Sequence, residues 1–175
     1  MRKKLFYLLL VVLGVFVGIF CFYSGSHSDS PKDYCAFCNS NVLIAQKFYE
    51  DDLVVALYTH KPVLPGHCLI IPKRHIDRFE KLSDEEFIHI GRVIKKVNMA
   101  AMKVFDTSSY LILQKNGIEA GQTVPHVHFH YIPRIAKDSS FLKFFWNMYI
   151  ASIQKPIKAE KMQEIVDKMK EAMEN

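Results

Sequence analysis

The chain has 175 residues and a mass of 20.3 kDa, which suits one domain with a single hydrophobic core. Half of the residues are apolar and 23% are charged, which excludes a disordered or low-complexity protein. The net charge is +5, but the first 25 residues contribute three basic residues and no acidic one. The remainder holds 20 basic and 18 acidic residues, so we expect no nucleic-acid polymer as a partner. Four unevenly spaced cysteines do not indicate a disulfide framework.

Residues 1–23 are predicted as a separate amino-terminal segment. Positions 5–23 carry no charge and directly follow three basic residues, and their helical length at about 1.5 Å per residue is close to that of a bilayer core. This length favours a retained transmembrane anchor, with a cleaved export signal as the alternative. The preceding basic residues predict a cytoplasmic amino terminus. We therefore expect a single-pass, membrane-anchored protein whose main domain is extracytoplasmic, with residues 24–32 as a linker.

The first predicted elements are two strands and a third that follows a turn. Gln46–Glu50 and Leu53–Tyr58 have the pattern of a hairpin, and His67–Ile71 is a further apolar strand. A long helix then begins at Ser83 as the N-cap, with Glu86 three residues later as its capping-box partner. The expected buried face of this helix follows the 3–4 spacing of Phe87, Ile90, Ile94, Val97, Ala101 and Val104.

The remaining elements complete the predicted fold. Tyr110–Gln114 and His126–Ile132 are expected strands on either side of a loop, and Lys158–Met173 has the pattern of an amphipathic helix. The sequence therefore predicts an α+β domain with an antiparallel sheet of about five strands, a long capped helix and a carboxy-terminal amphipathic helix. We expect this domain at residues 33–140, followed by a carboxy-terminal segment at 141–175.

Three histidines alternate along the last predicted strand, at His126, His128 and His130. Side chains at positions i, i+2 and i+4 of a strand share one face, so three imidazoles line one surface while Val127 and Phe129 point to the other. Imidazole acts near neutral pH as a nucleophile, an acid–base catalyst or a metal ligand. The pattern therefore indicates a catalytic or metal site.

The sequence GIEAGQTVPHVHFHYIPR at 117–134 resembles the signature of the histidine-triad (HIT) nucleotide-binding proteins, and PGHCLIIPKRH at 65–75 resembles their second motif. The resemblance covers residues 35–135. It implies a hydrolase or transferase that acts on the α-phosphate of a nucleoside phosphoramidate, a dinucleoside polyphosphate or an adenylated conjugate. A non-catalytic nucleotide-binding or interaction protein with the same fold is the alternative.

The same resemblance implies roles for the residues of the signature. His128 would be the nucleophile that forms a nucleotidyl-histidine intermediate, and His130 would contact the phosphate, with His126 as the third catalytic histidine. The backbone N–H of Gly121 and the hydroxyl of Thr123 would donate to phosphate oxygens and the leaving group.

Several positions near the signature leave alternatives open. The family usually has an amide where this chain has Lys115, which either pairs with an additional phosphate or faces solvent. Asn116 beside it keeps an amide as a candidate substrate contact, and Gln122 either binds substrate or stabilises its own loop. Thr59 stands where the family often has a ribose-binding Asp or Asn. His67 is either a wall of the base pocket or a strand histidine satisfied by its neighbours.

A second constellation combines a C-x-x-C knuckle, Cys35 and Cys38, with the distant His75 and His126. Two thiolates and two imidazoles suit a closed tetrahedral zinc site. One branch of the family has a zinc site at these four positions, so the resemblance implies a structural zinc here. A disulfide between the two cysteines, or two idle thiols, is the alternative.

An aromatic cluster follows the signature, at Phe141, Phe144, Phe145, Trp146 and Tyr149. Spacings of three and four residues favour packing in a helical core or a dimer contact over stacking on a nucleotide. A homodimer is left open by the sequence.

Overall fold

The structure of the protein is a computed structural model, which describes residues 4, 7, 34–134, 141–151 and 153–174. The chain divides into two units, Met1–Tyr34 and Cys35–Asn175. The second unit holds the sheet, its covering helices and every candidate site residue.

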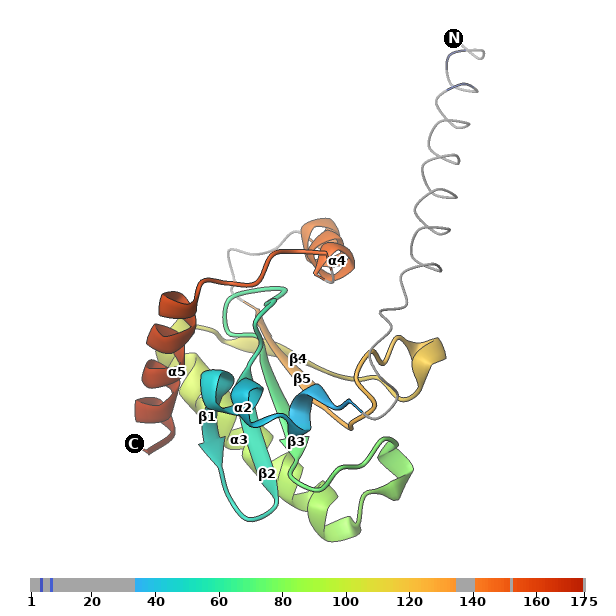
Figure 1. The fold of residues 1–175 in the computed structure, drawn as a ribbon. Coiled ribbons are helices and arrows are strands. Elements are labelled where there is room, and N and C mark those ends of the chain that lie inside the picture. The colour runs from blue at the N-terminus through green and yellow to red at the C-terminus, as the bar shows by residue number, and fades with distance from the viewer. Residues whose placement is uncertain (1–3, 5–6, 8–33, 135–140, 152, 175) are drawn as a thin grey trace. The chain divides into compact units, whose positions relative to one another are not determined.

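Five strands in the described part of the chain form one antiparallel sheet (Figure 1). Their order across the sheet is β1 (Lys47–Glu50), β2 (Val54–Tyr58), β3 (Cys68–Pro72), β5 (Phe129–Arg134) and β4 (Ser109–Gln114). The central neighbours β3 and β5 come from distant parts of the sequence, and their pairing sets Leu69 opposite His130. This sheet, with its helices, confirms the predicted α+β class.

The long helix α3 (Asp84–Phe105) begins where the sequence predicts. The Ser83 hydroxyl accepts from the Glu86 N–H, and the Glu86 carboxylate accepts from the Ser83 N–H, which confirms the capping box. The buried apolar residues of this helix are Ile90, Val93, Val97, Ala100 and Ala101. Phe87 departs from the predicted buried face, because its ring is 49% exposed and packs edge-on against Phe79.

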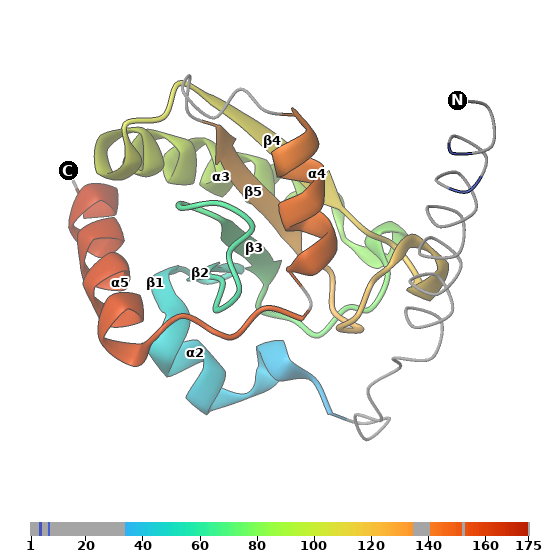
Figure 2. The same cartoon turned by 90° about the horizontal axis from the view of Figure 1, so that it is seen from above.

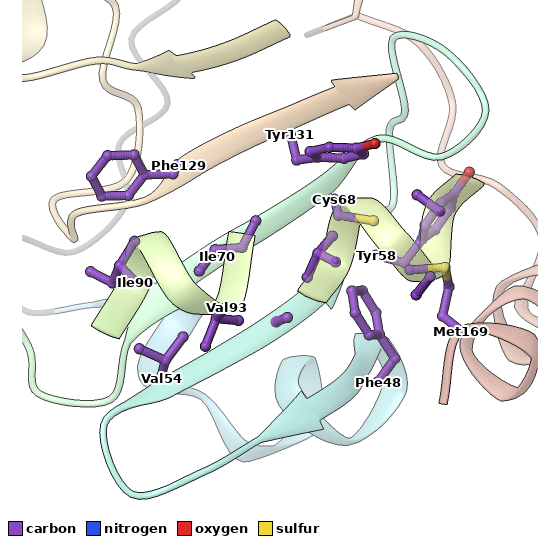
Figure 3. Close-up of a cluster of buried hydrophobic side chains, with 14 of the residues drawn as sticks. Phe48, Val54, Tyr58, Cys68, Ile70, Ile90, Val93, Phe129, Tyr131 and Met169 are labelled. Atoms are coloured by element: carbon purple, nitrogen blue, oxygen red, sulfur yellow. The ribbon is translucent and has the colours of Figure 1, made fainter. Parts of the chain in front are cut away.

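The main core lies between one face of the sheet and two helices, α3 and α5 (Ala159–Glu174). Figure 3 shows Ile90 and Val93 of α3 facing the strands, with Phe129 and Tyr131 of β5 on the same side. Because strand side chains alternate, these inward rings leave His128 and His130 for the opposite face of the sheet. The core therefore sets the orientation of the triad.

The triad face of the sheet is covered by the amino-terminal part of the domain. The short η1 (Ala36–Cys38) and α2 (Ser40–Gln46) pack on it through Phe37 and Leu43. Figure 2 shows α2 and α3 on opposite sides of the sheet. Helix α2 was not predicted from the sequence. It has seven residues, and its N-cap is Asn39, whose side chain accepts from the Asn41 N–H.

The triad segment differs from its prediction in one respect, because β5 begins at Phe129 and not at His126. The preceding residues bond elsewhere: the His126 N–H donates to the Val124 oxygen, and the Val127 N–H donates to the Ile76 oxygen. Only His130 of the three histidines therefore lies in a regular strand, while Val127, between the other two, is bonded to the loop after β3.

The aromatic cluster lies on α4 (Phe141–Ile150). Phe144 is buried against Val63, Leu64 and Ile132, which agrees with the expected core packing. Phe145 and Trp146 are exposed, at 49% and 59%. The possible homodimer is not tested by this single chain.

The localisation predicted from the sequence needs correction. A membrane anchor requires a helix of about 20 apolar residues. Among the helices of the described residues, none has the length and apolar character to cross a membrane. This finding contradicts the expected single-pass, extracytoplasmic arrangement and the membrane as a partner. Apart from Tyr7, the segment 5–23 lies outside the described residues, as does the linker at 24–32.

Candidate functional site

A cleft of about 450 Å³ opens on the triad face of the sheet. Its floor comes from the two residues that follow β2 and from Leu69 of β3, one wall comes from the triad segment, and the facing wall comes from η1 and α2. The lining residues are Ala36, Phe37, Val42, Gln46, Thr59, His60, Leu69, Thr123, Val124, His128 and His130. Apolar walls with a few converging polar groups are the usual composition of a small-molecule site.

The His128 ring is held in one tautomer. Its Nδ1 lies 2.6 Å from the backbone oxygen of His126, and because a carbonyl oxygen only accepts, Nδ1 carries the hydrogen. The lone pair is therefore on Nε2. Burial lowers the pKa of His128, so the ring is neutral at pH 7. A neutral imidazole with a lone pair in a cleft has the properties of a nucleophile.

His130 is oriented by His67. The Val63 N–H donates to Nδ1 of His67 over 3.2 Å, so the hydrogen of a neutral His67 ring is on Nε2. That Nε2 lies 2.9 Å from Nδ1 of His130, which must then accept. The remaining hydrogen of His130 is on its Nε2, which makes this atom a donor. Burial lowers the pKa of both rings, that of His67 to about 3, so both are neutral at pH 7.

His126 connects the triad to the cysteine knuckle. Its Nε2 lies 2.9 Å from the Pro72 oxygen and therefore donates. Its Nδ1 keeps a lone pair, which faces Cys35 Sγ at 3.3 Å and Cys38 Sγ at 3.6 Å. Burial lowers the pKa of His126 to about 4, which keeps Nδ1 available as a ligand atom. A histidine that donates one ring N–H to a carbonyl and turns the other nitrogen to a metal is a common arrangement.

Four candidate metal ligands converge beside the triad. The side chains of Cys35, Cys38, His75 and His126 offer ligand atoms that all lie within 4.8 Å of one another. His75 Nδ1 lies 3.4 Å from Cys38 Sγ. Zinc–sulfur and zinc–nitrogen bonds of about 2.3 and 2.0 Å at a tetrahedral angle separate sulfur from nitrogen by about 3.5 Å. The observed separations of 3.3 to 3.6 Å fit such a site.

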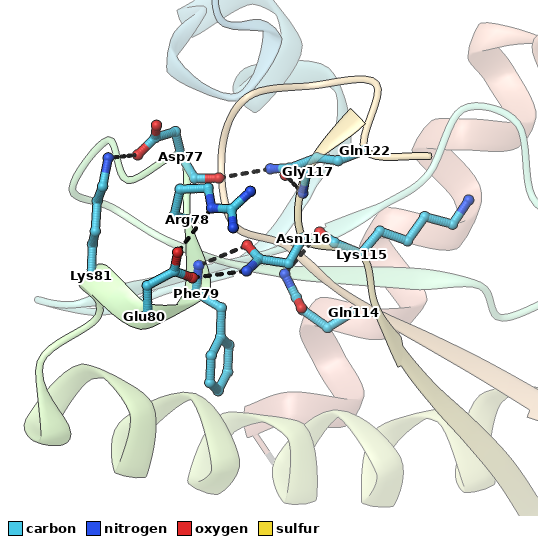
Figure 4. A network of polar contacts seen from close by, with 10 residues as sticks. All are labelled: Asp77, Arg78, Phe79, Glu80, Lys81, Gln114, Lys115, Asn116, Gly117 and Gln122. Atoms are coloured by element: carbon cyan, nitrogen blue, oxygen red, sulfur yellow. Dashed lines mark hydrogen bonds and ion pairs between the residues drawn. The ribbon is translucent and has the colours of Figure 1, made fainter. Parts of the chain in front are cut away.

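The loop before the triad is held by a polar network (Figure 4). The Asn116 side chain accepts from the Phe79 N–H and donates to Glu80, which ties the end of β4 to η2 (Phe79–Lys81). The Gln122 side chain accepts from the Gly117 N–H and donates to the Asp77 oxygen. Both amides are therefore engaged in holding the loop and in tying it to the segment at Asp77–Glu80.

The predicted substrate residues thus divide into two groups. Thr123 lines the cleft beside His128 and His130, whereas Asn116 and Gln122 serve the loop and do not line the cleft. The Gly121 N–H donates to the Ile118 oxygen over 2.8 Å and so is engaged within its own turn.

Sequence reasoning missed the facing wall of the cleft. Phe37 lies between the two cysteines of the knuckle, and its ring contacts His128 edge-on with centroids 5.2 Å apart. His60, which received no role from the sequence, also lines the cleft. The position of Phe37 within the C-x-x-C motif was the available signal, because ligands that converge on a metal carry the residues between them to the same place.

The sequence profile described as the HIT domain matches residues 41–137, more than half of the chain. The chain belongs to the HIT family. A bis(5'-nucleosyl)-tetraphosphatase (asymmetrical) from Schizosaccharomyces pombe is 43% identical over 96 residues, which are 55% of this chain and 53% of that protein. This HIT protein therefore spans about half the length of that curated relative.

Solved structures also resemble this HIT protein. The diadenosine triphosphate hydrolase of Plasmodium falciparum, solved with cyclomarin A, has a TM-score of 0.61 and 27% identity, and the match covers 74% of this chain and 77% of that one. A zinc-bound histidine triad family protein from Mycobacterium smegmatis has a TM-score of 0.61 and 24% identity, covering 80% and 93%. The second match is evidence of the fold alone.

Proposed function

We propose that this HIT protein is a nucleotide hydrolase or transferase that acts on the α-phosphate of a nucleoside phosphoramidate, a dinucleoside polyphosphate or an adenylated conjugate. One observation carries the proposal: His128 is neutral, with Nδ1–H bonded to a carbonyl and the lone pair of Nε2 left beside a cleft. The names of the S. pombe and P. falciparum relatives, a bis(5'-nucleosyl)-tetraphosphatase and a diadenosine triphosphate hydrolase, support this chemistry.

In the proposed reaction, Nε2 of His128 attacks the α-phosphorus. A phosphorus–nitrogen bond forms as the bond from phosphorus to the leaving group breaks, and the leaving group departs with the electron pair and takes up a proton. Water then attacks the same phosphorus and gives up a proton to the solvent, and the phosphorus–nitrogen bond breaks with its electron pair returning to Nε2. This step releases the nucleoside monophosphate and restores the neutral imidazole. An alcohol or amine in place of water makes the reaction a transfer.

The neighbouring donors would stabilise charge on the phosphoryl oxygens. His130 presents its Nε2–H as a result of the hydrogen bond from His67, and the Thr123 hydroxyl lies in the same cleft. Donors that are fixed before the reaction stabilise developing charge without the cost of reorganisation. In this proposal His67 is a positioning residue, because it acts through His130.

We also propose that the four converging ligands, Cys35, Cys38, His75 and His126, hold a structural zinc. A bound zinc would tie the knuckle to the triad segment by cross-linking parts of the chain that are distant in sequence. The fit rests on the sulfur–nitrogen separations and on the free Nδ1 of His126. The zinc-bound M. smegmatis protein shares this fold.

The test is turnover of a substrate panel by the wild-type protein and by His128→Ala. The panel contains adenosine and guanosine phosphoramidates and dinucleoside polyphosphates, and release of the nucleoside monophosphate is measured. We expect turnover by the wild type and its loss in His128→Ala, with a nucleotidyl adduct on the wild-type His128 after an alkaline quench. His89→Gln is the control, because His89 lies on α3 and bonds Asp51, away from the cleft. Near wild-type hydrolysis by His128→Ala would refute the mechanism.

A further inference from the structure

Lys115 is a cation beside the triad that the proposed reaction has not used. It directly follows the last residue of β4, Gln114, and precedes Asn116, whose side chain is bonded to η2. Its backbone is thus fixed on both sides. Figure 4 shows the Lys115 side chain leading away from the network of Asp77, Glu80 and Asn116.

The Lys115 stem lies against Gly121. A Cβ atom on Gly121 would stand 3.5 Å from the Lys115 Nζ and 3.8 Å from its Cδ, and Gly121 has a φ of +79°. The glycine therefore leaves space for the lysine at the start of the turn that leads to Thr123. The ammonium group is therefore held beside the loop that leads from Gly121 to Thr123, and Thr123 lines the cleft together with His128 and His130.

The ammonium group has no anionic partner among the described residues. None of the ion pairs found there includes Lys115, and the side chain is half-buried. No aspartate or glutamate lines the cleft. Burial is the main cause that lowers the pKa of His67 and of His130, and the charge of Lys115 is a smaller cause in the same direction. A half-buried cation without a counter-charge favours the binding of an anion.

We infer that Lys115 determines specificity for the leaving group and favours substrates whose leaving group is a phosphate chain over those whose leaving group is an amine. This inference rests on the proposed function. When the bond from the α-phosphorus breaks, a phosphate leaving group gains negative charge, and a fixed ammonium stabilises that gain in the transition state. An amine leaving group is not an anion and gains no comparable benefit.

The test compares two substrates in the same protein samples. Steady-state kcat/KM is measured with diadenosine triphosphate and with adenosine 5'-phosphoramidate for the wild type, Lys115→Gln, Lys115→Arg and Lys95→Gln. We expect the ratio of the two values to fall at least about tenfold in Lys115→Gln, as removal of a close unit charge predicts, and to be largely restored in Lys115→Arg. Lys95→Gln removes the same charge from the exposed surface of α3 and should keep the ratio.

Two further readouts separate this role from a structural one. Turnover of the phosphoramidate by Lys115→Gln reports that the variant is folded. Added salt should lower kcat/KM for the dinucleotide more in the wild type than in Lys115→Gln, because the lost interaction is electrostatic. An equal loss with both substrates, or an unchanged ratio, would overturn the assignment of Lys115 while the hydrolase proposal stands. Failure of the wild type to turn over either substrate would refute both.

Discussion

The Nε2 atom of His67 lies 2.9 Å from the Nδ1 atom of His130. One residue belongs to the P-G-H turn before β3 and the other to β5, and the pairing of these two strands brings them together. The Val63 N–H donates to the Nδ1 atom of His67, and this bond determines that the Nε2 atom of His67 is the donor. The two motifs that resemble the HIT signature are therefore connected by a hydrogen bond that sets the proton position on a triad histidine.

His67→Ala should reduce kcat/KM by about tenfold, less than the roughly hundredfold or greater loss typical of deleting a donor to a developing oxyanion. The variant frees His130 to adopt the tautomer with Nε2 unprotonated, which cannot donate to a phosphate oxygen. Steady-state kinetics, with circular dichroism to confirm folding, measure this effect. An unchanged kcat/KM in a folded variant would show that His130 does not depend on His67.

Cys38→Ser should lose bound zinc, thermal stability and activity together. The sulfur of Cys38 lies close to both histidines of the cluster, and His126 also accepts through its backbone oxygen from His128, the proposed nucleophile. Loss of the metal would therefore loosen the segment that orients His128. Metal analysis of the purified protein and unfolding with and without a chelator are the measurements.

Cys68→Ala is the matched control for the zinc prediction. Cys68 is the third cysteine among the described residues, and it is buried in the core with its thiol bonded to the Gly66 oxygen. Its loss should reduce stability and leave the zinc content at about one per chain. If the purified wild-type protein contains no zinc and Cys35 and Cys38 form a disulfide, the zinc proposal is wrong.

The elements of the fold were predictable where a local sequence pattern was enough to identify them. The capping box at Ser83 and Glu86 and the short apolar run of β2 are local, and both lead to the observed elements. The small helix α2 was not predictable, because its seven residues carry no helical repeat and its stability comes from packing on the sheet. Because α2 was not predicted, the wall of the cleft that faces the triad was not predicted either.

The candidate site was predictable as a set of residue types but not as a set of contacts. Alternation placed His128 and His130 on one face correctly, because Phe129 between them is buried in the core. Sequence spacing could not reveal that the side chain of Asn116 bonds to η2 or that the side chain of Gln122 donates to the Asp77 oxygen. Those partners lie more than 30 residues away, and only the packed loops bring them within reach.

Gly66→Ala should destabilise the protein by about 1–3 kcal/mol. Gly66 has a φ of +89°, which alanine adopts at a cost, and a Cβ there would stand 2.5 Å from Pro133 Cγ. Either the turn before His67 or Pro133 must move. Urea unfolding gives the change in free energy of unfolding, and a shift in the position of His67 should also lower activity.

Gly91→Ala is the same substitution at a position where we expect the opposite effect on stability. Gly91 lies inside α3, where an added Cβ meets nothing within 4 Å. Alanine has the higher helix propensity, so we expect a gain in stability of up to about 1 kcal/mol. If both variants lose stability equally, the clash with Pro133 is not the cause of the effect at Gly66.

The Glu86 carboxylate joins the start of α3 to the segment after β3. It accepts from Arg74 Nε at 2.9 Å and Nη2 at 2.8 Å, and it also accepts from the Ser83 N–H. The hydrogen bonds from Arg74 are the largest cause that lowers the pKa of Glu86, from an ordinary value of 4.5 to about 2. The group therefore favours the folded state when it is ionised.

Glu86→Gln should cost about 2 kcal/mol of stability at pH 7, because the amide carries no charge and keeps only one of the two oxygens that accept from Arg74. Since the pKa of Glu86 is about 2 in the folded state and about 4.5 when unfolded, its contribution is complete above pH 4.5 and is lost as the pH falls towards 2. The difference between the wild type and Glu86→Gln in urea unfolding should therefore be constant from pH 7 to 5 and shrink below that. A difference that stays the same at the lowest pH at which both proteins fold would mean that packing, and not the charge of Glu86, stabilises this helix start.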